Sequence, residues 1–180
     1  MWDKKGAYKR YMAAEKGISP LAFAPAKDAI IKVNSYEHDE SGITTEDPEI
    51  TKAMQDKRIG KETYLAKELE GCETVKIYGD KSSPQALLSW GSNKGVSAEV
   101  AEKMGLRAVY LQVLWPFPIK KFQEALSGVK ELVCVENNAT GQLIRLIQGF
   151  GFKVDKKILK YDGRPFSMDG LEQEVKKIIT

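Results

Sequence analysis

The sequence predicts an α/β protein in which residues 72–180 form an open, mostly parallel sheet with helices on both faces. Short apolar runs alternate with helical patterns along this part of the chain, which is the pattern of a parallel sheet covered by helices. The chain has 180 residues, 42% hydrophobic and 29% charged, as in ordinary globular proteins. Loop signals dominate earlier, so we divide the chain into residues 1–71 and residues 72–180.

The first expected strand of the sheet is Ala86–Trp90, which runs into the turn Gly91–Gly95 (GSNKG). A helix should follow, because Val96, Val100 and Met104 recur at four-residue spacing. The turn has neither the GxGxxG nor the Walker spacing, and a tight strand-to-helix connection explains its glycines without a ligand. If an anion bound here, the backbone amides after the turn's serine and the positive helix end would attract it.

The longest apolar run, Leu106–Leu114, predicts the second strand, and the two prolines of Trp115–Pro118 (WPFP) end it. Pro118 suits the first turn of a helix that carries Phe122 and Leu126. The aromatic turn has two interpretations. Its rings either anchor the core or, if exposed, mark an interface.

The third expected strand is Glu131–Glu136, and a helix bearing Leu143 and Ile147 follows the loop after it. We expect a short strand around Phe152–Val154 and a last helix that begins after Ser167, a good N-cap residue. The sheet should therefore have about four or five strands. The apolar face of the last helix carries Leu171, Val175 and Ile178.

Residues 1–71 contain only one convincing strand, Ala29–Val33. Asp47 is a candidate N-cap with Pro48 at the first helical position, opening a long helix that Gly71 ends. The apolar residues of this helix are sparse and Gly60 interrupts them, so we expect it to lean on a neighbour rather than sit in a core. We therefore expect residues 1–71 to be one part of a larger structural unit.

Composition excludes several classes of protein. With 28 Lys and Arg against 25 Asp and Glu, the net charge is +3, and no basic stripe suited to nucleic acid is present. No apolar run approaches the length of a membrane span, and Met1–Gly6 lacks the apolar core of a signal peptide, so we expect a cytoplasmic chain without a membrane partner. Cys72 and Cys134 have no CxxC spacing, which argues against redox or metal chemistry.

The one histidine, His38, lies in the run Glu37–Glu40 (EHDE). Adjacent residues of an extended chain point to alternate faces, so at most two of these side chains could reach one ion, and no HxxxH or Cys/His cluster completes a site. We expect no metal. A solvated acidic loop is the first interpretation, and a loop that meets another subunit or a cofactor edge is the second. A metal-binding protein built on this histidine is the weakest hypothesis.

Polar residues follow the third strand in the sequence ENNATGQL. Asn137, Asn138 and Thr140 sit at the strand's carboxyl end, where ligands usually bind in open α/β sheets. One of them suffices to cap the next helix. Two carboxamides plus Gln142 exceed that need, which suggests recognition of another chain or loop. The alternative is a free-standing nucleotide- or coenzyme A-binding module that uses the crevice between Ser92 and the two asparagines.

No Ser/His/Asp, Cys/His or paired-carboxylate set can be assembled from the sequence, so we assign no catalytic residue. Eight motifs, however, occur in a fixed order that covers nearly the whole chain. Together they resemble the carboxyl-terminal part of the alpha subunit of 2-oxoacid:ferredoxin oxidoreductases of the 2-oxoglutarate synthase type. The motifs are YKRY (8–11), GISP (17–20), NSYEHDE (34–40), TTEDPE (44–49), WGS (90–92), WPFP (115–118), VENNATGQL (135–143) and KYDGRPF (160–166).

The resemblance implies a thiamine diphosphate-dependent oxidation of a 2-oxoacid to acyl-coenzyme A, with electrons passing through an iron-sulfur cluster to ferredoxin. It implies that residues 1–71 are the end of a thiamine-pyrimidine domain plus a linker helix, and that residues 72–180 are a transketolase C-terminal-like domain. Partners would be the beta subunit and the remaining alpha-subunit domains, and this chain alone would bind no cofactor. Interface or crevice candidates are Ser92, Asn137, Asn138, Thr140, Gln142, Arg164 and His38.

The chain departs from the family pattern in two motifs. Leu21 follows GISP where many relatives have an arginine, a candidate contact for the substrate carboxylate, and leucine cannot form that ion pair. The turn Gly91–Gly95 also differs from the usual Gly-Ser-Thr with an aromatic residue. The family's amino-terminal domains, with the acidic residue that activates the thiamine aminopyrimidine, are absent, so we expect a fragment or a split-gene product.

Overall fold

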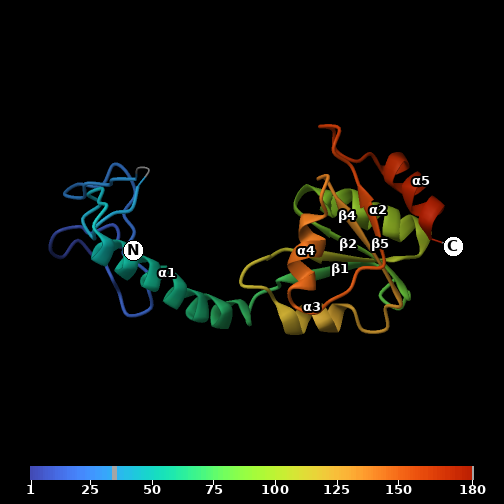
Figure 1. Ribbon diagram of the computed structural model, residues 1–180, viewed down its shortest axis with the longest axis horizontal. Coiled ribbons are helices and arrows are strands. Elements are labelled where there is room, and N and C mark those ends of the chain that lie inside the picture. Colours follow the sequence, from blue (N-terminus) through green and yellow to red (C-terminus); the bar gives the residue numbers. More distant parts are fainter. Residues whose placement is uncertain (34–35, 180) are drawn as a thin grey trace. The chain divides into compact units, whose positions relative to one another are not determined.

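A computed structural model describes residues 1–33 and 36–179 of the chain. The chain forms two compact units, Met1–Glu70 and Gly71–Thr180, which are drawn in Figure 1. We describe each unit by itself.

The first unit consists of loops and one long helix, α1 (Pro48–Leu69). The Asp47 side chain accepts hydrogen bonds from the backbone N–H groups of Glu49 and Ile50 at 2.9 and 3.0 Å, which confirms the predicted N-cap. The helix ends at Leu69, slightly before Gly71, and it continues through Gly60. Glycine inside a helix costs only about 1 kcal/mol relative to alanine, so one such residue does not break it.

The predicted strand Ala29–Val33 is wrong. These residues have no strand structure, and Ile30 and Val33 are exposed. A strand needs a second strand beside it that completes its backbone hydrogen bonds. The isolated β-bridge of this unit joins His38 to Thr44 and does not involve Ala29–Val33. The β-branched run therefore had the right residue types for a strand but no partner within the described residues.

The second unit contains a five-stranded mixed sheet in the order β1-β3-β2-β4-β5. The four neighbouring strands β3, β2, β4 and β5 are parallel, and the edge strand β1 pairs with β3 in the antiparallel sense. An open, mostly parallel sheet was predicted and is confirmed. The strands are β1 (Val75–Gly79), β2 (Gln85–Trp90), β3 (Arg107–Leu111), β4 (Glu131–Glu136) and β5 (Lys156–Leu159).

Two strands differ from the sequence prediction. The edge strand β1 was missed, although Val75 and Ile77 alternate with polar neighbours as in a half-buried strand. The last strand β5 begins at Lys156, after the predicted Phe152–Val154 segment, whose apolar residues instead pack against the core cluster. An apolar run marks burial, but only pairing with β4 decides which residues form the strand.

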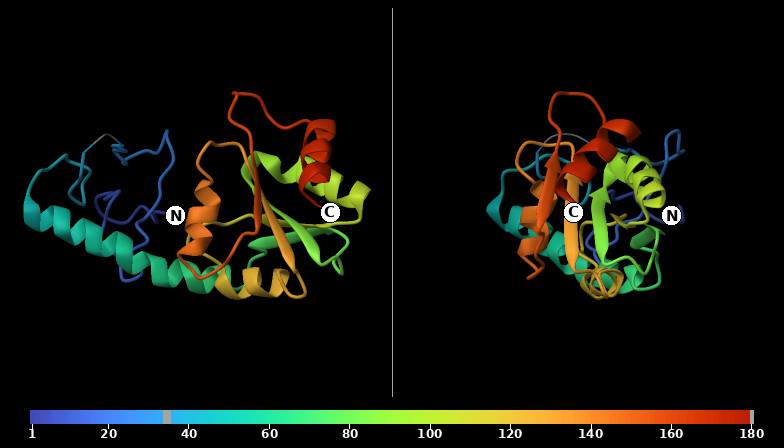
Figure 2. Two further views of the ribbon diagram at one scale, coloured as in Figure 1. Left: turned by 45° about the vertical axis from the view of Figure 1, so that its right-hand side comes forward. Right: turned by 90° about the vertical axis from the view of Figure 1, so that its right-hand side faces the viewer.

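Helices cover both faces of this sheet, as predicted. One apolar cluster joins α3 (Ile119–Ala125) and α4 (Gln142–Gln148) to the face that carries Leu88, and a second joins α2 (Lys94–Met104) and α5 (Met168–Ile178) to the face that carries Leu87. The two leucines are adjacent, because successive strand residues point to opposite faces. Figure 2 shows these helix layers from two further sides.

The predicted cap of the last helix is confirmed, since Ser167 Oγ accepts a hydrogen bond from the Gly170 N–H at 3.2 Å. The short 3-10 turn η1 (Gly91–Asn93) joins β2 to α2. Among the residues that the structure describes, no helix is both long and apolar enough to cross a membrane.

Candidate functional site at the carboxyl ends of β2 and β4

Between β2 and β4 the chain changes the direction in which it adds successive strands to the sheet. From β2 the chain passes through α2 to β3 on one side, and from β4 it passes through α4 to β5 on the other. Ligands of open α/β sheets usually bind outside the carboxyl ends of the strands at such a switch point. A hollow of about 260 Å³ lies there, lined by Trp90, Gly91, Ser92, Asn93, Asn137, Asn138 and Gln142.

Glu136, the last residue of β4, places a fully buried carboxylate beneath this hollow (0% exposed). It accepts hydrogen bonds from the backbone N–H groups of Leu143 and Ile144 at 2.9 and 3.4 Å, and from Asn138 Nδ2 at 2.7 Å. The first N–H groups of a helix have no partner inside the helix, and a carboxylate is well suited to them. A strand residue therefore caps α4, a role that the sequence did not reveal.

Asn138 closes the loop between β4 and α4. Its Oδ1 accepts from the N–H groups of Thr140, Gly141 and Gln142 at 3.0, 2.7 and 3.3 Å. Gly141 has a left-handed backbone (φ 65°), and a Cβ there would lie 3.1 Å from Ile144 Cδ1, so glycine suits the turn. The prediction that one asparagine or a threonine would cap the helix is thus resolved in favour of Asn138, with help from the strand.

The loop amides are consequently occupied. Consecutive N–H groups from Thr140 to Ile144 all donate to Asn138 or Glu136. In nucleotide-binding α/β folds the corresponding amides at a helix N-terminus hold a phosphate. Here a buried carboxylate takes that place, so this side of the hollow is not built for a phosphate group.

Asn93 forms a buried wall of the hollow (4% exposed) and was missed by sequence reasoning. Its Nδ2 donates to the carbonyl oxygen of Val135 on β4 at 3.4 Å. Within the described residues its Oδ1 accepts no hydrogen bond. Its position was the available signal in the sequence, because Asn93 lies between Ser92 and the first residue of α2. A side chain at this strand-to-helix connection can reach the end of the neighbouring strand β4.

The structure brings four of the predicted site residues together at this hollow: Ser92, Asn137, Asn138 and Gln142. Thr140 is exposed and lies outside the lining. Arg164 belongs to a different region, where its guanidinium bonds to Asp162 through Nε at 3.0 Å and Nη2 at 2.5 Å. A hydrogen bond from Lys160, together with these bonds from Arg164, holds the pKa of the Asp162 carboxyl well below its usual range.

Cys134 lies in β4 two residues before Glu136 and is fully buried. Burial raises the pKa of its thiol far above the usual value, and the nearby Glu136 carboxylate raises it further. Because the thiolate is the reactive form, this cysteine is inert. No group of three or more His, Cys, Asp or Glu side chains among the described residues could hold a metal ion.

His38, in the first unit, is buried (6% exposed) and stacks on Tyr11, with ring centroids 4.4 Å apart and 3° between the planes. The interpretation of its surroundings as a solvated acidic loop is therefore wrong for His38 itself, whereas the hydrogen bonds of Asp39 and Glu40 lie at exposed positions. Stacking removes the ring from water, and Glu37 beside it is paired with Arg58, which lowers the pKa of that carboxyl.

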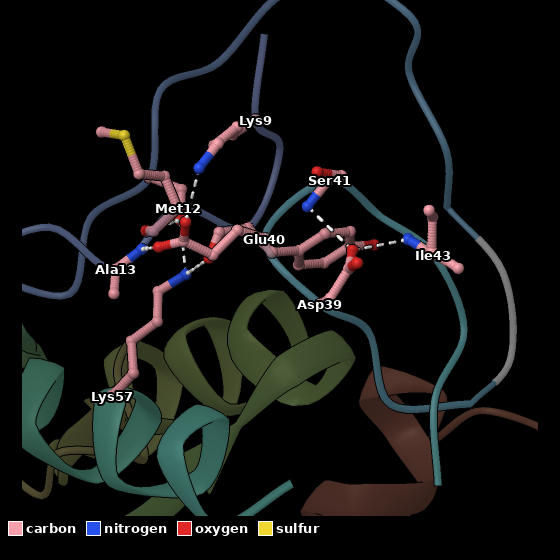
Figure 3. A network of polar contacts seen from close by, with 10 residues as sticks. Lys9, Met12, Ala13, Asp39, Glu40, Ser41, Ile43 and Lys57 are labelled. Atoms are coloured by element: carbon pink, nitrogen blue, oxygen red, sulfur yellow. Dashed lines mark hydrogen bonds and ion pairs between the residues drawn. The ribbon is translucent and has the colours of Figure 1, made fainter. Parts of the chain in front are cut away.

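The remaining acidic residues of this run tie loops together, as Figure 3 shows. Glu40 accepts from the Ala13 N–H at 2.8 Å and from Lys9 Nζ at 2.9 Å, and Asp39 accepts from the N–H groups of Ser41 and Ile43. Hydrogen bonds from the backbone and from lysine lower the pKa of Glu40. The run EHDE is thus a structural element of the first unit.

Lys57 of α1 completes this network. Its Nζ donates to the carbonyl oxygen of Tyr11 at 2.6 Å and to Ser19 Oγ at 2.5 Å. Burial lowers its pKa, as do neighbouring positive charges. The lysine therefore fastens the segment around Ser19 to the helix.

Comparisons with known proteins bear on this arrangement, although no family model matches the chain. The alpha subunit of 2-oxoacid:ferredoxin oxidoreductase 2 from Aeropyrum pernix is 36% identical over 178 residues, which cover 96% of this chain and 27% of that protein. The alpha subunit of 2-oxoacid:ferredoxin oxidoreductase 1 from Sulfurisphaera tokodaii is 35% identical over 176 residues, covering 96% of this chain and 28% of the relative.

The chain is also similar to a solved structure, that of 2-oxoglutarate:ferredoxin oxidoreductase from Magnetococcus marinus with 2-oxoglutarate, coenzyme A and succinyl-CoA bound. The TM-score is 0.66 at 26% identity, covering 98% of this chain and 31% of that one. The chain thus spans only 27 to 28% of the length of these curated relatives. Over this portion the chain is homologous to the alpha subunit of 2-oxoacid:ferredoxin oxidoreductases.

Proposed function

We propose that this chain is the carboxyl-terminal part of the alpha subunit of a thiamine diphosphate-dependent 2-oxoacid:ferredoxin oxidoreductase, and that it serves assembly and subunit contact. The whole cytoplasmic enzyme would convert a 2-oxoacid and coenzyme A to acyl-coenzyme A and carbon dioxide, and pass the electrons to ferredoxin. The observation that carries the proposal is homology to such alpha subunits over 96% of the chain. The partners would be the beta subunit and the remaining alpha-subunit domains.

The surface of the first unit supports a role in contact. Its buried hydrophobic residues among those described are Tyr8, Ala22 and Met54, too few for a core of its own. Large exposed apolar surface marks an interaction site. The exposed large hydrophobic residues of this unit are Met1, Ile18, Phe23, Ile30, Val33, Tyr36, Ile43, Ile59, Tyr64 and Leu65.

This surface fits the assignment of residues 1–71 to the end of a thiamine-pyrimidine domain plus a linker helix. In such an assignment the rest of that domain would cover the exposed side chains. Residues 72–180 would be the transketolase C-terminal-like domain, which agrees with their two well-developed apolar clusters on either face of the sheet.

The residues present do not fit the cofactors of the family. An iron-sulfur cluster is held by several thiolates, whereas the sequence has two cysteines, of which Cys134 is buried in the core. No acidic cluster among the described residues could hold a metal ion beside a diphosphate. We therefore propose that thiamine diphosphate and the cluster are bound by other parts of the assembled enzyme, and that this chain holds no complete catalytic set.

Reconstitution tests this proposal. The chain is mixed with the beta subunit and the missing alpha-subunit domains of a relative such as the one from Aeropyrum pernix, and 2-oxoacid-dependent reduction of ferredoxin is measured. We expect the chain to join the complex and to raise activity above that of the other parts alone. The proposal is refuted if the chain does not join the complex and activity does not rise.

A free-standing nucleotide- or coenzyme A-binding module is the competing function, and the position of the hollow at the switch point favours it. The occupied amides from Thr140 to Ile144 weigh against it. Titration calorimetry of the isolated chain with coenzyme A and with ATP distinguishes the two, because only the module would bind them in the absence of partners.

A further inference from the structure

We propose that the hollow between the ends of β2 and β4 binds an uncharged amide group, supplied by a main-chain segment of a partner polypeptide. The inference deepens the proposed function, on which it rests for the identity of the partner, by naming the chemistry of one contact. It is carried by the hydrogen-bonding groups that the hollow presents.

The first of these groups is an acceptor on the largely buried residue Asn93. Asn93 Nδ2 donates to the carbonyl oxygen of Val135, and because a carbonyl can only accept, the orientation of the Asn93 carboxamide is settled by this bond. Its Oδ1 is therefore the atom left over in the lining of the hollow, and it accepts no hydrogen bond within the described residues. In the described part of the chain this atom is not one of the fully buried side-chain atoms that lack a hydrogen-bond partner, so a donor of a bound group can reach it from the hollow.

The second group is a set of donors on the rim. The side chains of Asn137 and Gln142 and the hydroxyl of Ser92 line the hollow and make no hydrogen bonds to other described residues. A bound group that pairs with all of these atoms offers both a donor, for Asn93 Oδ1, and an acceptor, for the carboxamide NH2 groups of the rim. An amide offers both, whereas a phosphate or carboxylate anion offers acceptors only.

Charge and size agree with an amide. None of the lining residues is charged, and the nearby ammonium of Lys94 lies over the rings of Tyr78 and Tyr110, 5.7 and 5.9 Å from their centroids. At about 260 Å³ the hollow is smaller than the usual pockets for small molecules. It would accommodate the tip of a loop better than a whole nucleotide.

The rim is also held in place before anything binds. Asn138 and Glu136 between them satisfy the loop amides, so the backbone that carries Asn137 and Gln142 is ordered by its own hydrogen bonds. Preorganised groups lose less entropy on binding. Asn138 and Glu136 thus act as positioning residues for the rim.

The first experiment uses the full chain alone and observes the side-chain NH2 signals of Asn137 and Gln142 by NMR. The probes are N-acetylglycine N-methylamide, pantetheine and inorganic pyrophosphate. We expect the blocked glycine to shift both signals saturably. Gln142→Ala should weaken its binding about 2- to 10-fold, the value of one net hydrogen bond, while Gln148→Ala on the exposed side of the same helix should not.

Three outcomes would overturn the inference. If pyrophosphate shifts these signals and the blocked glycine does not, the hollow binds an anion rather than an amide. If pantetheine binds and the blocked glycine does not, the ligand of the hollow is not a polypeptide. No shift with any probe up to its solubility limit would show that the hollow is not a binding site.

The second experiment repeats the reconstitution with Gln142→Ala and Gln148→Ala. We expect the first variant to associate about 2- to 10-fold more weakly with its partners and the second to match the wild type. The two proposals can fail separately. If the wild type does not associate but binds the blocked glycine, the proposed function fails; if it associates while Gln142→Ala has no effect, this inference fails.

Discussion

Asn138 Nδ2 donates a hydrogen bond to Glu136 Oε2 at 2.7 Å, and the same carboxylate oxygen accepts from the Leu143 N–H at 2.9 Å. Through this pair the end of β4, the loop and the first turn of α4 are joined by one buried carboxylate. The contact also orients Asn138 so that its Oδ1 meets the loop amides. The shape of the hollow therefore depends on a strand residue that does not itself line it.

Replacing Glu136 by glutamine should destabilise the protein by about 1–3 kcal/mol, because the new NH2 group would face N–H donors and leave a buried donor without an acceptor. Urea unfolding followed by circular dichroism measures the effect. The matched control is Glu99→Gln on the exposed side of α2, which should change stability by less than about 0.5 kcal/mol. Equal effects of the two variants would contradict this role for Glu136.

The two adjacent asparagines should respond differently to substitution by alanine. Asn138→Ala removes the acceptor of three loop amides and should cost about 1–2 kcal/mol, as the loss of a helix cap does. Asn137 is exposed, so Asn137→Ala should stay within about 0.5 kcal/mol of the wild type. The same unfolding measurement decides, and a larger loss for Asn137→Ala would reverse the assignment of the two roles.

The two cysteines should differ in reactivity. Cys134 is buried with a raised thiol pKa, whereas Cys72 is exposed. A chromogenic disulfide reagent at pH 8 should therefore titrate one thiol per folded chain and a second only after unfolding in denaturant. Cys72→Ser provides the control, since its folded form should not react. Rapid reaction of that variant would show that β4 is accessible in the folded state.

Glu172 should make the stability of the protein depend on acid. It bonds to Lys103 of α2 and to Lys176 of α5, and these contacts lower its pKa below the ordinary 4.5. A carboxyl whose pKa is lower in the folded state stabilises that state above its unfolded pKa, and the contribution disappears as pH falls through the folded value.

Glu172→Gln should accordingly lower stability at pH 7, and its difference from the wild type should shrink as pH falls below 4.5. Urea midpoints over this pH range measure the difference. Glu174→Gln, which removes an exposed ion pair with Lys177, is the control and should have little effect throughout. A constant difference for Glu172→Gln would indicate that the loss comes from packing rather than charge.

Local signals were sufficient for elements whose ends are determined by their own residues. Asp47 and Ser167 were recognisable as caps because their side chains satisfy amides two or three residues away. Glu131–Glu136 was recognisable as a strand because it is a buried apolar run between polar ends. Segments that depend on distant partners were not: β1 is an edge strand paired with β3, and Ala29–Val33 pairs with no strand among the residues that the structure describes.

The sequence by itself determined the fold class of residues 72–180, the positions of its main helices and strands, and the placement of polar residues after β2 and β4, because hydrophobic periodicity and caps are local properties. Only the tertiary structure decided what those polar residues do. It buried Glu136 under the loop, turned Asn138 inward and left Asn93 Oδ1, Asn137 and Gln142 facing the hollow. The reason is that a carboxamide satisfies whichever donors and acceptors the fold brings to it, and chain order does not reveal them.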